Sequence, residues 1–477
     1  MVPDDEGGGL MRADLLFDPV DGLDEALAAV DAFDAALVAG LLRPQPGQAA
    51  GVVELADAVA GTPLAVRAAE AADKTVAGAA GEDHFVALAA ARAALLGSVH
   101  DALTARVTEA VGRPVAEEAA PGGAGGAGGA DHAANLLAAA RSWLSDLARA
   151  GWQGIDHELV GGAAPVVSAM LPDPALRRQA TLLDGFAAEL AASCPGATLE
   201  RIPVRRWADL WSRALLLTLP GATGAPAADT ATGRLLPLGI DVQEHATAVQ
   251  AQVHAVFEPA DGTAPRLVRA AASAPKPDTV VGAGLWQLLR PHLSLLTAVS
   301  EGRAMDLDAM PVTAEGDLIW DDGRARTGEP ADSLATARVA LPTAAAAATA
   351  PLDRHPARIA VPVLLEGYEA EQDDDGVAFR IAGHRLPVDT DRIPAAGPLT
   401  AEAVAASGAC IALLRWDAGE FHVQPLAVER TVRKKAVAVH AGAWAGGTTD
   451  KAGVRAEKAA TGAVDALRER AGRLLRK

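Results

Sequence analysis

The feature that most constrains the fold of this chain is a change in hydrophobic periodicity near residue 230. Before this point, apolar residues recur at intervals of three and four, as on one face of an α-helix. Beyond it, apolar and polar residues alternate with a period of two, as in a half-buried strand. Helices followed by strands, without repeating βαβ units, are typical of α+β proteins. We therefore expect an α+β fold, with an N-terminal all-helical domain, a mainly antiparallel β-rich domain and a C-terminal basic amphipathic helix.

The first half of the chain divides into two helical regions, 1–116 and 132–225. The pattern predicts helices at 21–42, 82–112, 133–152, 172–194 and 203–219. Between the two regions lies the Gly-rich stretch 117–131, which has no apolar pattern. It lacks the preceding strand and the Lys-Ser/Thr ending of a phosphate-binding loop. We therefore expect this stretch to be a linker.

Two tryptophans mark the last helix predicted in the first half. Trp207 and Trp211 share one helical face, and Arg205, Arg206 and Arg213 lie off it. An aromatic stripe at helical spacing is typical of a buried core. Tryptophan beside arginine is also a composition found at protein interfaces. Trp207 and Trp211 are therefore candidate partner-binding residues as well as candidate core residues.

The alternating pattern predicts an antiparallel α+β domain over 232–445. Its predicted strands are 238–245, 248–258, 266–273, 317–321, 357–369, 377–386, 410–416, 421–428 and 432–439. Two helices interrupt them, one at 281–303 with a kink at Pro291 and one at 399–408. The segments QDDDG at 372–376 and DAGE at 417–420 are expected to be hairpin turns.

The stretch GIDVQEHATAVQAQVHAVFEP, residues 239–259, contains an alternating row of polar residues. Asp241 and His245 are odd-numbered members of this row, whereas His254 is even-numbered. This change of parity indicates a bulge in one long bent strand or a tight corner between two strands, and the absence of glycine near 246–248 favours the bulge. Nine extended residues would place the two histidines roughly 30 Å apart, which opposes a metal site. We expect a hydrated or partner-facing row, with these three residues as binding candidates and no metal.

Other candidate binding residues are basic. Lys276 stands between two prolines ahead of a predicted helix, where it could present its ammonium group to an anion or belong to a rigid connection. Arg433, Lys434 and Lys435 lie in the predicted strand 432–439, and alternation divides them between its two faces. Phosphate contacts from this segment are possible, although it does not form one basic stripe.

The charge of the chain is unevenly distributed. The formal net charge of −19 opposes general adhesion to nucleic acid or to an anionic membrane. Residues 429–477, however, hold 12 basic and 5 acidic residues, which gives +7 there and −26 in the remainder. The segment 450–477 has the pattern of a basic amphipathic helix, and its apolar face predicts docking on the acidic body or on a partner. The residues on that face are Val464, Leu467, Ala471 and Leu474. The alternative is a frayed tail that only aids solubility.

Motifs of known chemistry are missing from the sequence. It contains no HExxH, CxxC, GxSxG or Walker motif, and its two cysteines lie far apart. No secretory signal or run of about 20 apolar residues is recognisable, so we expect a cytoplasmic protein without a membrane partner or cofactor. These absences favour an accessory or adaptor protein that binds protein partners. The alternatives are a nucleic-acid-binding protein that uses the basic C-terminal region and an enzyme with a site in the α+β domain that follows no motif.

The stretch 234–322 contains PLGIDVQEHATAV, ASAPKPDTVVGAGLW and GDLIWDD. It resembles uncharacterised actinobacterial proteins encoded beside SWIM zinc-finger proteins and MoxR-type ATPases. This chain lacks both the Cys/His set of the finger and the Walker motifs of the ATPase. The resemblance therefore implies a non-enzymatic accessory component of a cytoplasmic multiprotein assembly linked to a MoxR-type ATPase, with no catalytic residues to transfer.

Overall fold

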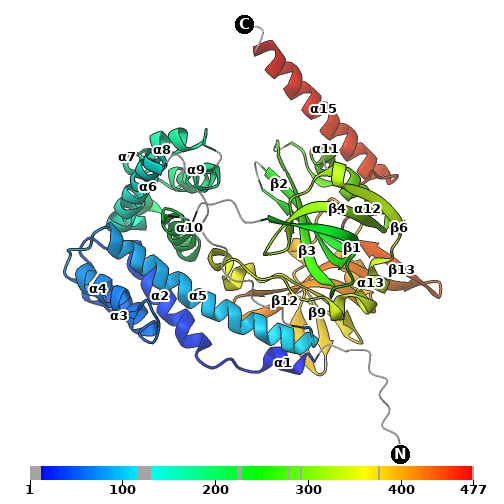
Figure 1. Cartoon of the computed structure of the whole chain (residues 1–477), viewed down its shortest axis with the longest axis horizontal. Coiled ribbons are helices and arrows are strands. Elements are labelled where there is room, and N and C mark those ends of the chain that lie inside the picture. The colour runs from blue at the N-terminus through cyan, green and yellow to red at the C-terminus, as the bar shows by residue number, and fades with distance from the viewer. Residues whose placement is uncertain are drawn as a thin grey trace, which may run out of the picture.

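The computed structural model of this chain describes residues 12–114, 130–173, 175–220, 222, 228–245, 248–277, 279–290, 293–373 and 376–474. It confirms the α+β class, because helices fill the first half, strands fill most of the second and a long helix ends the chain (Figure 1). Most of the expected linker 117–131 and the expected kink at Pro291 lie outside the described residues.

The helical region contains all five predicted helices and several shorter ones. Its helices are α1 (Asp14–Phe17), α2 (Leu23–Ala39), α3 (Pro46–Ala58), α4 (Ala65–Val76), α5 (Glu82–Val111), α6 (Ala130–Ala150), α7 (His157–Gly161), α8 (Ala163–Met170), α9 (Arg177–Ala192) and α10 (Val204–Leu216). The sequence did not indicate α1, α3, α4, α7 or α8. These helices are short, and most are rich in Ala and Gly, whose weak contrast with polar residues blurs the helical period.

Helix α5 belongs to two hydrophobic cores. Phe85 and Leu88, in its first half, pack in the core of the helical region, together with α2, α6, α9 and α10. Val99, Leu103 and Val107, in its second half, pack in the core of the β-rich region. Its 30 residues give a length of about 45 Å. Among the described residues, α5 is the one helix long and apolar enough to cross a membrane, and half of its most apolar window is buried inside the protein.

The first sheet of the β-rich region closes on itself. Its strands are β1 (Ala228–Glu244), β2 (Ala248–Pro259), β3 (Arg266–Pro275), β4 (Arg303–Thr313), β5 (Asp317–Leu318) and β6 (Ala325–Pro330). The pairing order is β1-β2-β3-β5-β4-β6, and β1 also pairs with β4, so five strands form a ring and β6 is added to β4. Most pairs are antiparallel, whereas β3 and β5 are parallel.

The interpretation of residues 239–259 as one bent strand is wrong. β1 and β2 form an antiparallel hairpin, in which the backbone N–H of His245 donates to the carbonyl of Ala248 at 2.8 Å. The bulge lies earlier, between Pro237 and Gly239 of β1. A Cβ at Gly239 would stand 2.7 Å from the Cβ of Leu426 in a second sheet. The glycine is therefore required where the two sheets approach. The change from odd-numbered to even-numbered polar residues results from the hairpin between β1 and β2 and not from this bulge.

Two smaller sheets and several helices complete the β-rich region. The four-stranded sheet has the order β13-β12-β11-β7 and the three-stranded sheet the order β10-β9-β8. These strands are β7 (Val361–Glu366), β8 (Glu369–Asp373), β9 (Gly376–Ile381), β10 (His384–Pro387), β11 (Ala409–Asp417), β12 (Glu420–Val432) and β13 (Lys435–His440). The helices are α11 (Leu285–Leu288), α12 (Leu293–Glu301), α13 (Ser333–Val339) and α14 (Ala401–Ala405). The segments predicted as single strands at 357–369 and 377–386 each contain parts of two strands.

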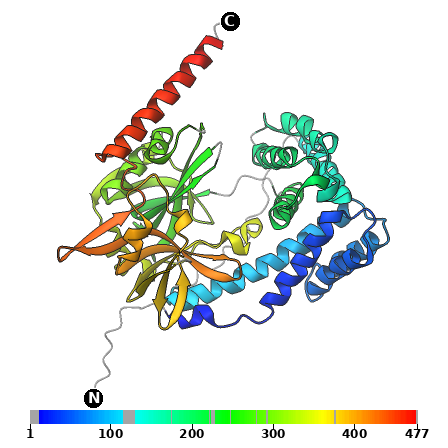
Figure 2. The same cartoon turned by 180° about the vertical axis from the view of Figure 1, so that it is seen from behind.

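The C-terminal helix α15 (Lys451–Leu474) projects from the β-rich region in both views (Figures 1 and 2). Its first half packs against α11 and the turn before it, where a Cβ at Gly284 would meet the Cβ of Ala460 at 2.8 Å. Val464 is partly buried, whereas the side chains of the other three predicted docking residues, Leu467, Ala471 and Leu474, lie outside the described part. The helix thus docks on its own chain through residues nearer its N-terminus than the sequence indicated.

Candidate functional site

Two neighbouring cavities lie between the helical region and the β-rich region. The first, of about 460 Å³, is lined by α2, α5, α10, the segment 351–358 and the β11–β12 turn, and we call it the helical cavity. The second, of about 740 Å³, is lined by β1, β2, β3, the segment 346–362 and part of α5, and we call it the sheet cavity. Arg206, Ala357 and Arg358 line both cavities, so the two adjoin. Together we call them the central cleft.

Arginine is concentrated in the central cleft. Nine of the 35 arginines in the chain line it: Arg92, Arg205, Arg206, Arg213, Arg269, Arg354, Arg358, Arg392 and Arg415. Seven acidic residues also line it: Asp31, Asp34, Asp209, Glu315, Asp317, Asp353 and Asp417. The lining therefore has a net charge of +2 within a chain whose net charge is −19. Such a local reversal of sign raises the concentration of anions in a cleft.

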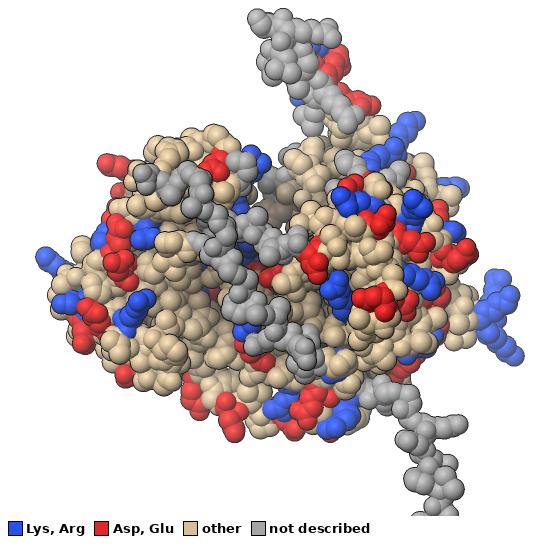
Figure 3. Space-filling model, in the orientation of Figure 1, with Lys and Arg blue, Asp and Glu red and all other residues tan. Residues whose placement is uncertain are grey.

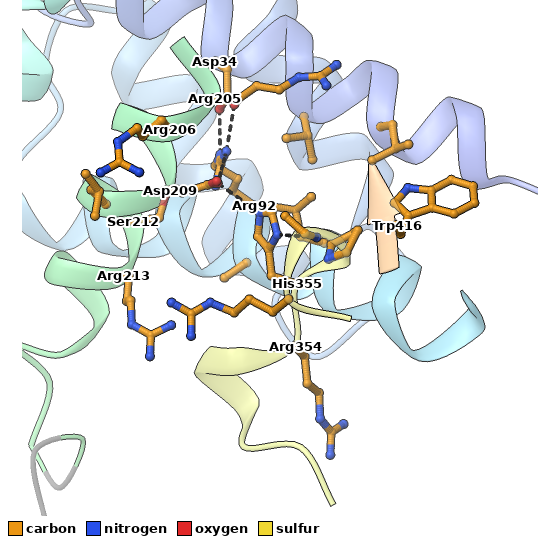
Figure 4. Close-up of a pocket in the computed structure, with 18 of the residues that line it drawn as sticks. Asp34, Arg92, Arg205, Arg206, Asp209, Ser212, Arg213, Arg354, His355 and Trp416 are labelled. Atoms are coloured by element: carbon orange, nitrogen blue, oxygen red, sulfur yellow. Dashed lines mark hydrogen bonds and ion pairs between the residues drawn. The ribbon is translucent and has the colours of Figure 1, made fainter. Parts of the chain in front are cut away.

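A buried ion-pair network forms one wall of the helical cavity (Figure 4). Arg92 of α5 donates from Nε and Nη2 to the two carboxylate oxygens of Asp34 in α2, at 2.6 and 2.8 Å. The Nη2 of Arg92 is also 2.7 Å from a carboxylate oxygen of Asp209 in α10. Burial alone would lower the pKa of Arg92, but the charges and hydrogen bonds of the two carboxylates raise it overall. Arg92 is therefore a protonated junction that ties α2, α5 and α10 together.

Asp209 connects this network to the segment 351–358. The Nε2 of His355 lies 3.1 Å from a carboxylate oxygen of Asp209. Burial tends to raise the pKa of Asp209, but His355 and Arg92 together hold it below its ordinary value. The β-rich region thus reaches the helical network through one histidine, which Figure 4 shows beside Asp209.

Helix α10 supplies the arginines at the rim of the helical cavity because it is amphipathic. The guanidinium of Arg205 forms a fork with the carboxylate of Asp31, with N–O distances of 2.8 and 2.6 Å. Arg206 pairs with Glu189 in the same way. The Arg205 side chain remains 71% exposed. A guanidinium has five N–H donors and a forked carboxylate engages two, so each pair retains donors for a ligand.

The rest of the helical cavity is largely apolar. Its apolar lining residues include Leu27, Val30, Leu210, Leu352 and Trp416, the last of which stands across the cavity from α10 in Figure 4. A cavity with an apolar wall and a few charged groups suits a small molecule that has both apolar and charged parts. The helical cavity therefore combines the two surfaces that an amphipathic anion requires.

The sheet cavity begins where one face of the first sheet changes from apolar to polar. Leu236, Val256 and Leu267 of this face pack in a small apolar core between the sheets. Further along the same strands, the face carries His254 and Arg269, which are directly opposite each other on β2 and β3. Gln243, Gln250 and Gln252 follow them at the cavity wall. The bulge in β1 lies at the same level and alters which β1 side chains face the second sheet.

His254 is buried at the base of the sheet cavity, where its side chain is 1% exposed. Its Nε2 has no hydrogen-bond partner among the residues described here. Burial lowers its pKa far below the ordinary value, against the opposing charge of Asp241, so the imidazole is neutral. Asp241 itself accepts from Arg415 at 2.9 Å and from Gln424 at 2.7 Å, which joins β1 to β11 and β12.

The structure does not bring the two predicted histidines together. His245 is exposed beside the hairpin turn, next to Ala248, whereas His254 lies six residues further along β2. At about 3.3 Å per residue, this register separates them by roughly 20 Å. Lys276 is buried, and its ammonium group is 3.2 Å from the carboxylate of Glu244. A neighbouring carboxylate thus neutralises the lysine that the sequence offered to an anion.

Trp207 and Trp211 lie in the core of the helical region and are almost completely buried. The indole N–H of Trp211 donates to the carbonyl of Leu144 at 2.9 Å, and the ring of Trp207 meets Trp152 edge to face. These contacts hold α10 with its tryptophans inward, so a partner does not reach them. The arginines on the other side of α10 are the ones that line the central cleft.

Arg433, Lys434 and Lys435 occupy the tip of a protruding hairpin. Arg433 and Lys434 form the turn between β12 and β13, with φ values of 49° and 65°, and Lys435 begins β13. The predicted strand 432–439 is therefore interrupted by a turn within its basic cluster. Figure 3 shows Lys and Arg gathered at the edge of the molecule where this hairpin protrudes in Figure 1.

The stability of the protein is expected to depend on the protonation of His254. Its pKa is lowered in the folded protein from 6.5, mainly by burial. As the pH falls below about 6.5, the unfolded chain takes up a proton at this residue that the folded chain does not, so stability decreases. In urea unfolding between pH 7 and pH 5, the His254→Gln variant should therefore lose less stability than the wild type. Burial also lowers the pKa values of His100 and His440, but these residues are present in both proteins and cancel in the comparison. Parallel pH curves for the two proteins would contradict this expectation.

The described residues contain no group of three or more His, Cys, Asp or Glu placed to hold a metal ion. The polar chemistry of the central cleft is thus that of guanidinium, imidazole, amide and carboxylate groups. No family model, curated protein or solved structure matches this chain.

Proposed function

We propose that this protein binds a small anionic molecule that carries an apolar or aromatic group, and that it does so in the helical cavity. The observation that carries this proposal is the convergence of arginines on that cavity in a chain of net charge −19. Guanidinium groups bind phosphate and carboxylate groups through paired hydrogen bonds, which favours a phosphorylated or carboxylated ligand.

The arginines of the helical cavity divide into two roles. Arg92 is 2% exposed and held by two carboxylates, so it shapes the wall and is not available to a ligand. Arg205 and Arg206 are largely exposed at the rim, where donors remain for an anion. Trp416 and the leucines provide the surface for the apolar part of the ligand. A ligand with both parts should therefore bind more tightly than either part alone.

The accessory role within a multiprotein assembly, and its link to a MoxR-type ATPase system, stay predictions. A ligand-binding protein could act as such a component if the occupied cleft changed how it meets a partner. The projecting helix α15 and the basic β12–β13 hairpin are the surfaces that would meet that partner. Binding of nucleic acid and catalysis stay alternative predictions.

We expect phenyl phosphate to bind more tightly than inorganic phosphate or phenol when each is titrated calorimetrically into the full chain. Replacing Arg205 with Gln removes a charge that reaches only the helical cavity. A hydrogen bond to a charged group contributes about 1.5–3 kcal/mol, so the Arg205→Gln variant should bind phenyl phosphate at least about tenfold more weakly.

The matched control is Arg326→Gln, which removes an exposed arginine on β6 outside both cavities. This variant should bind phenyl phosphate with the wild-type affinity. The proposal fails if phenyl phosphate does not bind the wild type, or if the two variants bind it equally well.

A further inference from the structure

We propose that the sheet cavity is a second anion subsite of the same cleft, in which His254, Arg269 and Arg415 hold a second anionic group of the ligand. The inference rests on the proposed function and specifies it, because it makes the ligand an aromatic or apolar molecule with two anionic groups. One group meets the arginines of the helical cavity and the other enters the sheet cavity.

The first observation in support is the unpartnered Nε2 of His254. A buried polar nitrogen without a hydrogen bond costs free energy, and nearly all such groups in folded proteins have a partner. A neutral imidazole has one nitrogen that donates and one that accepts. With its proton on Nε2, His254 would donate to a carboxylate or phosphate oxygen at the base of the sheet cavity once the side chains that cover this buried nitrogen move aside. Such a ligand would satisfy the nitrogen.

The second observation is the pair of guanidinium groups beside this histidine. Arg269 is directly opposite His254 across β2 and β3, so their Cβ atoms are about 5 Å apart. Its Nε and Nη2 already donate to the carboxylate of Asp317, at 2.9 and 3.0 Å, so the donors of its Nη1 are the ones left for an anion. Arg415 approaches from β11 and is held by Asp241 and Gln424, which fixes the direction of its guanidinium group. Its side chain is only 11% exposed, so an anion that reaches it is largely shielded from water. Shielding strengthens the attraction between an anion and a guanidinium.

The lining of the sheet cavity favours an anionic group over a second ring. Apart from histidine, none of the described residues that line it is aromatic, so a flat ring would find no surface on which to stack. Gln250 and Gln252 add amide donors to the wall around His254. The helical cavity, in contrast, contains Trp416 and several leucines. The two cavities thus suit different parts of one molecule.

The two subsites can be occupied by one molecule because the cavities adjoin. Arg206 and Arg358 line both, so they stand where the central part of the ligand would pass. Helix α5 runs along both cavities and contributes Leu96 to the first and His100 to the second. These two residues are about 6 Å apart along the helix axis, which is a distance that a single small molecule spans.

The test compares probes with one and two anionic groups. Phenyl phosphate has one, whereas 4-carboxyphenyl phosphate and its longer analogue 4-(2-carboxyethyl)phenyl phosphate have two at different separations. Calorimetric titration of the full chain should show at least one of the two-anion probes binding at least tenfold more tightly than phenyl phosphate. The His254→Gln and Arg269→Gln variants should lose this gain and keep the wild-type affinity for phenyl phosphate. The Arg326→Gln control should keep both affinities.

A second measurement is independent of any fold defect in the His254→Gln variant. In protein with ¹⁵N-labelled histidine, the imidazole signal of His254 should move when the tighter two-anion probe is added and stay unchanged with phenyl phosphate. If phenyl phosphate binds the wild type but neither two-anion probe gains affinity, the second subsite is wrong and the proposed function stands. If none of the probes binds the wild type, the proposed function itself fails and the second subsite with it.

Discussion

The Arg92→Met variant should lose about 3–5 kcal/mol of the free energy of unfolding, as measured by urea denaturation at pH 7. Arg92 is the only cation within hydrogen-bonding distance of Asp34 that the described residues provide, and Asp34 is 1% exposed. Methionine is similar in length but leaves this carboxyl group buried without its partner. Burial already raises the pKa of Asp34 to about 6 against the effect of Arg92, so in the variant Asp34 would take up a proton at pH 7 and stay buried without hydrogen bonds from Arg92. Removing one partner of a buried ion pair is among the most destabilising changes a single substitution makes.

Two further variants test this explanation. The double variant Asp34→Asn with Arg92→Met removes both charges and should recover part of the lost stability. The Arg205→Met variant breaks the exposed pair with Asp31 and should cost less than about 1 kcal/mol, because water screens such pairs. Equal losses for Arg92→Met and Arg205→Met would show that the buried network does not stabilise the helical region.

The Gly151→Ala variant should lose more than about 3 kcal/mol of the free energy of unfolding. Gly151 follows α6 and has a φ of 70° and a ψ of 169°, a conformation found almost only in glycine that costs other residues about 1–3 kcal/mol. A Cβ there would also stand 2.2 Å from the backbone nitrogen of Gly40, which follows α2. Because backbone atoms surround this position, the ends of α2 and α6 would have to separate, and such overpacking adds about 1–3 kcal/mol.

Gly112→Ala is the matched control for this substitution. Gly112 caps α5 with a φ of 62°, and a Cβ there would meet no atom within 4 Å. Its substitution should therefore cost only the conformational part, about 1–2 kcal/mol. If chemical denaturation gives both variants the same loss, the close approach of α2 and α6 has no energetic importance.

The fold class was predictable because it depends on local periodicity, and the missed elements are those in which that signal is weak. Strand β4 was not predicted, and only its first residue fell in the predicted helix 281–303, although Met305 and Leu307 are buried and alternate with the exposed Asp306. The strand is rich in Ala, Met and Asp, which are not typical of strands, so its alternation was not recognised. The need for glycine at position 239, beside the bulge, was not predictable because it depends on Leu426, a residue 187 positions further along the chain.

The central cleft was less predictable, because its contacts join distant parts of the sequence. The sequence placed Arg205 and Arg206 on the side of α10 away from the tryptophans, which was the available signal. It did not show that Asp31 lies beside Arg205, since 174 residues separate the two. His254 was identified as a polar strand residue, but its position between Arg269 and Arg415 depends on the assembly of two sheets. The cleft arises from tertiary packing that one sequence does not encode as a motif.

Because α5 packs in both hydrophobic cores, it limits how far the walls of the central cleft can move when a ligand binds. One end of the helix is fixed among the other helices, and at its other end Arg113 donates to the carbonyl of Pro362 at 2.8 Å. Widening the cleft would require a continuous helix of about 45 Å to bend, or apolar side chains to leave a core. We therefore expect α5 to act as a rigid support, so that the cleft keeps the same width when a ligand binds. Little of the binding free energy is then lost to moving the walls of the cleft. Small-angle X-ray scattering should therefore give the same radius of gyration for the protein with and without the ligand.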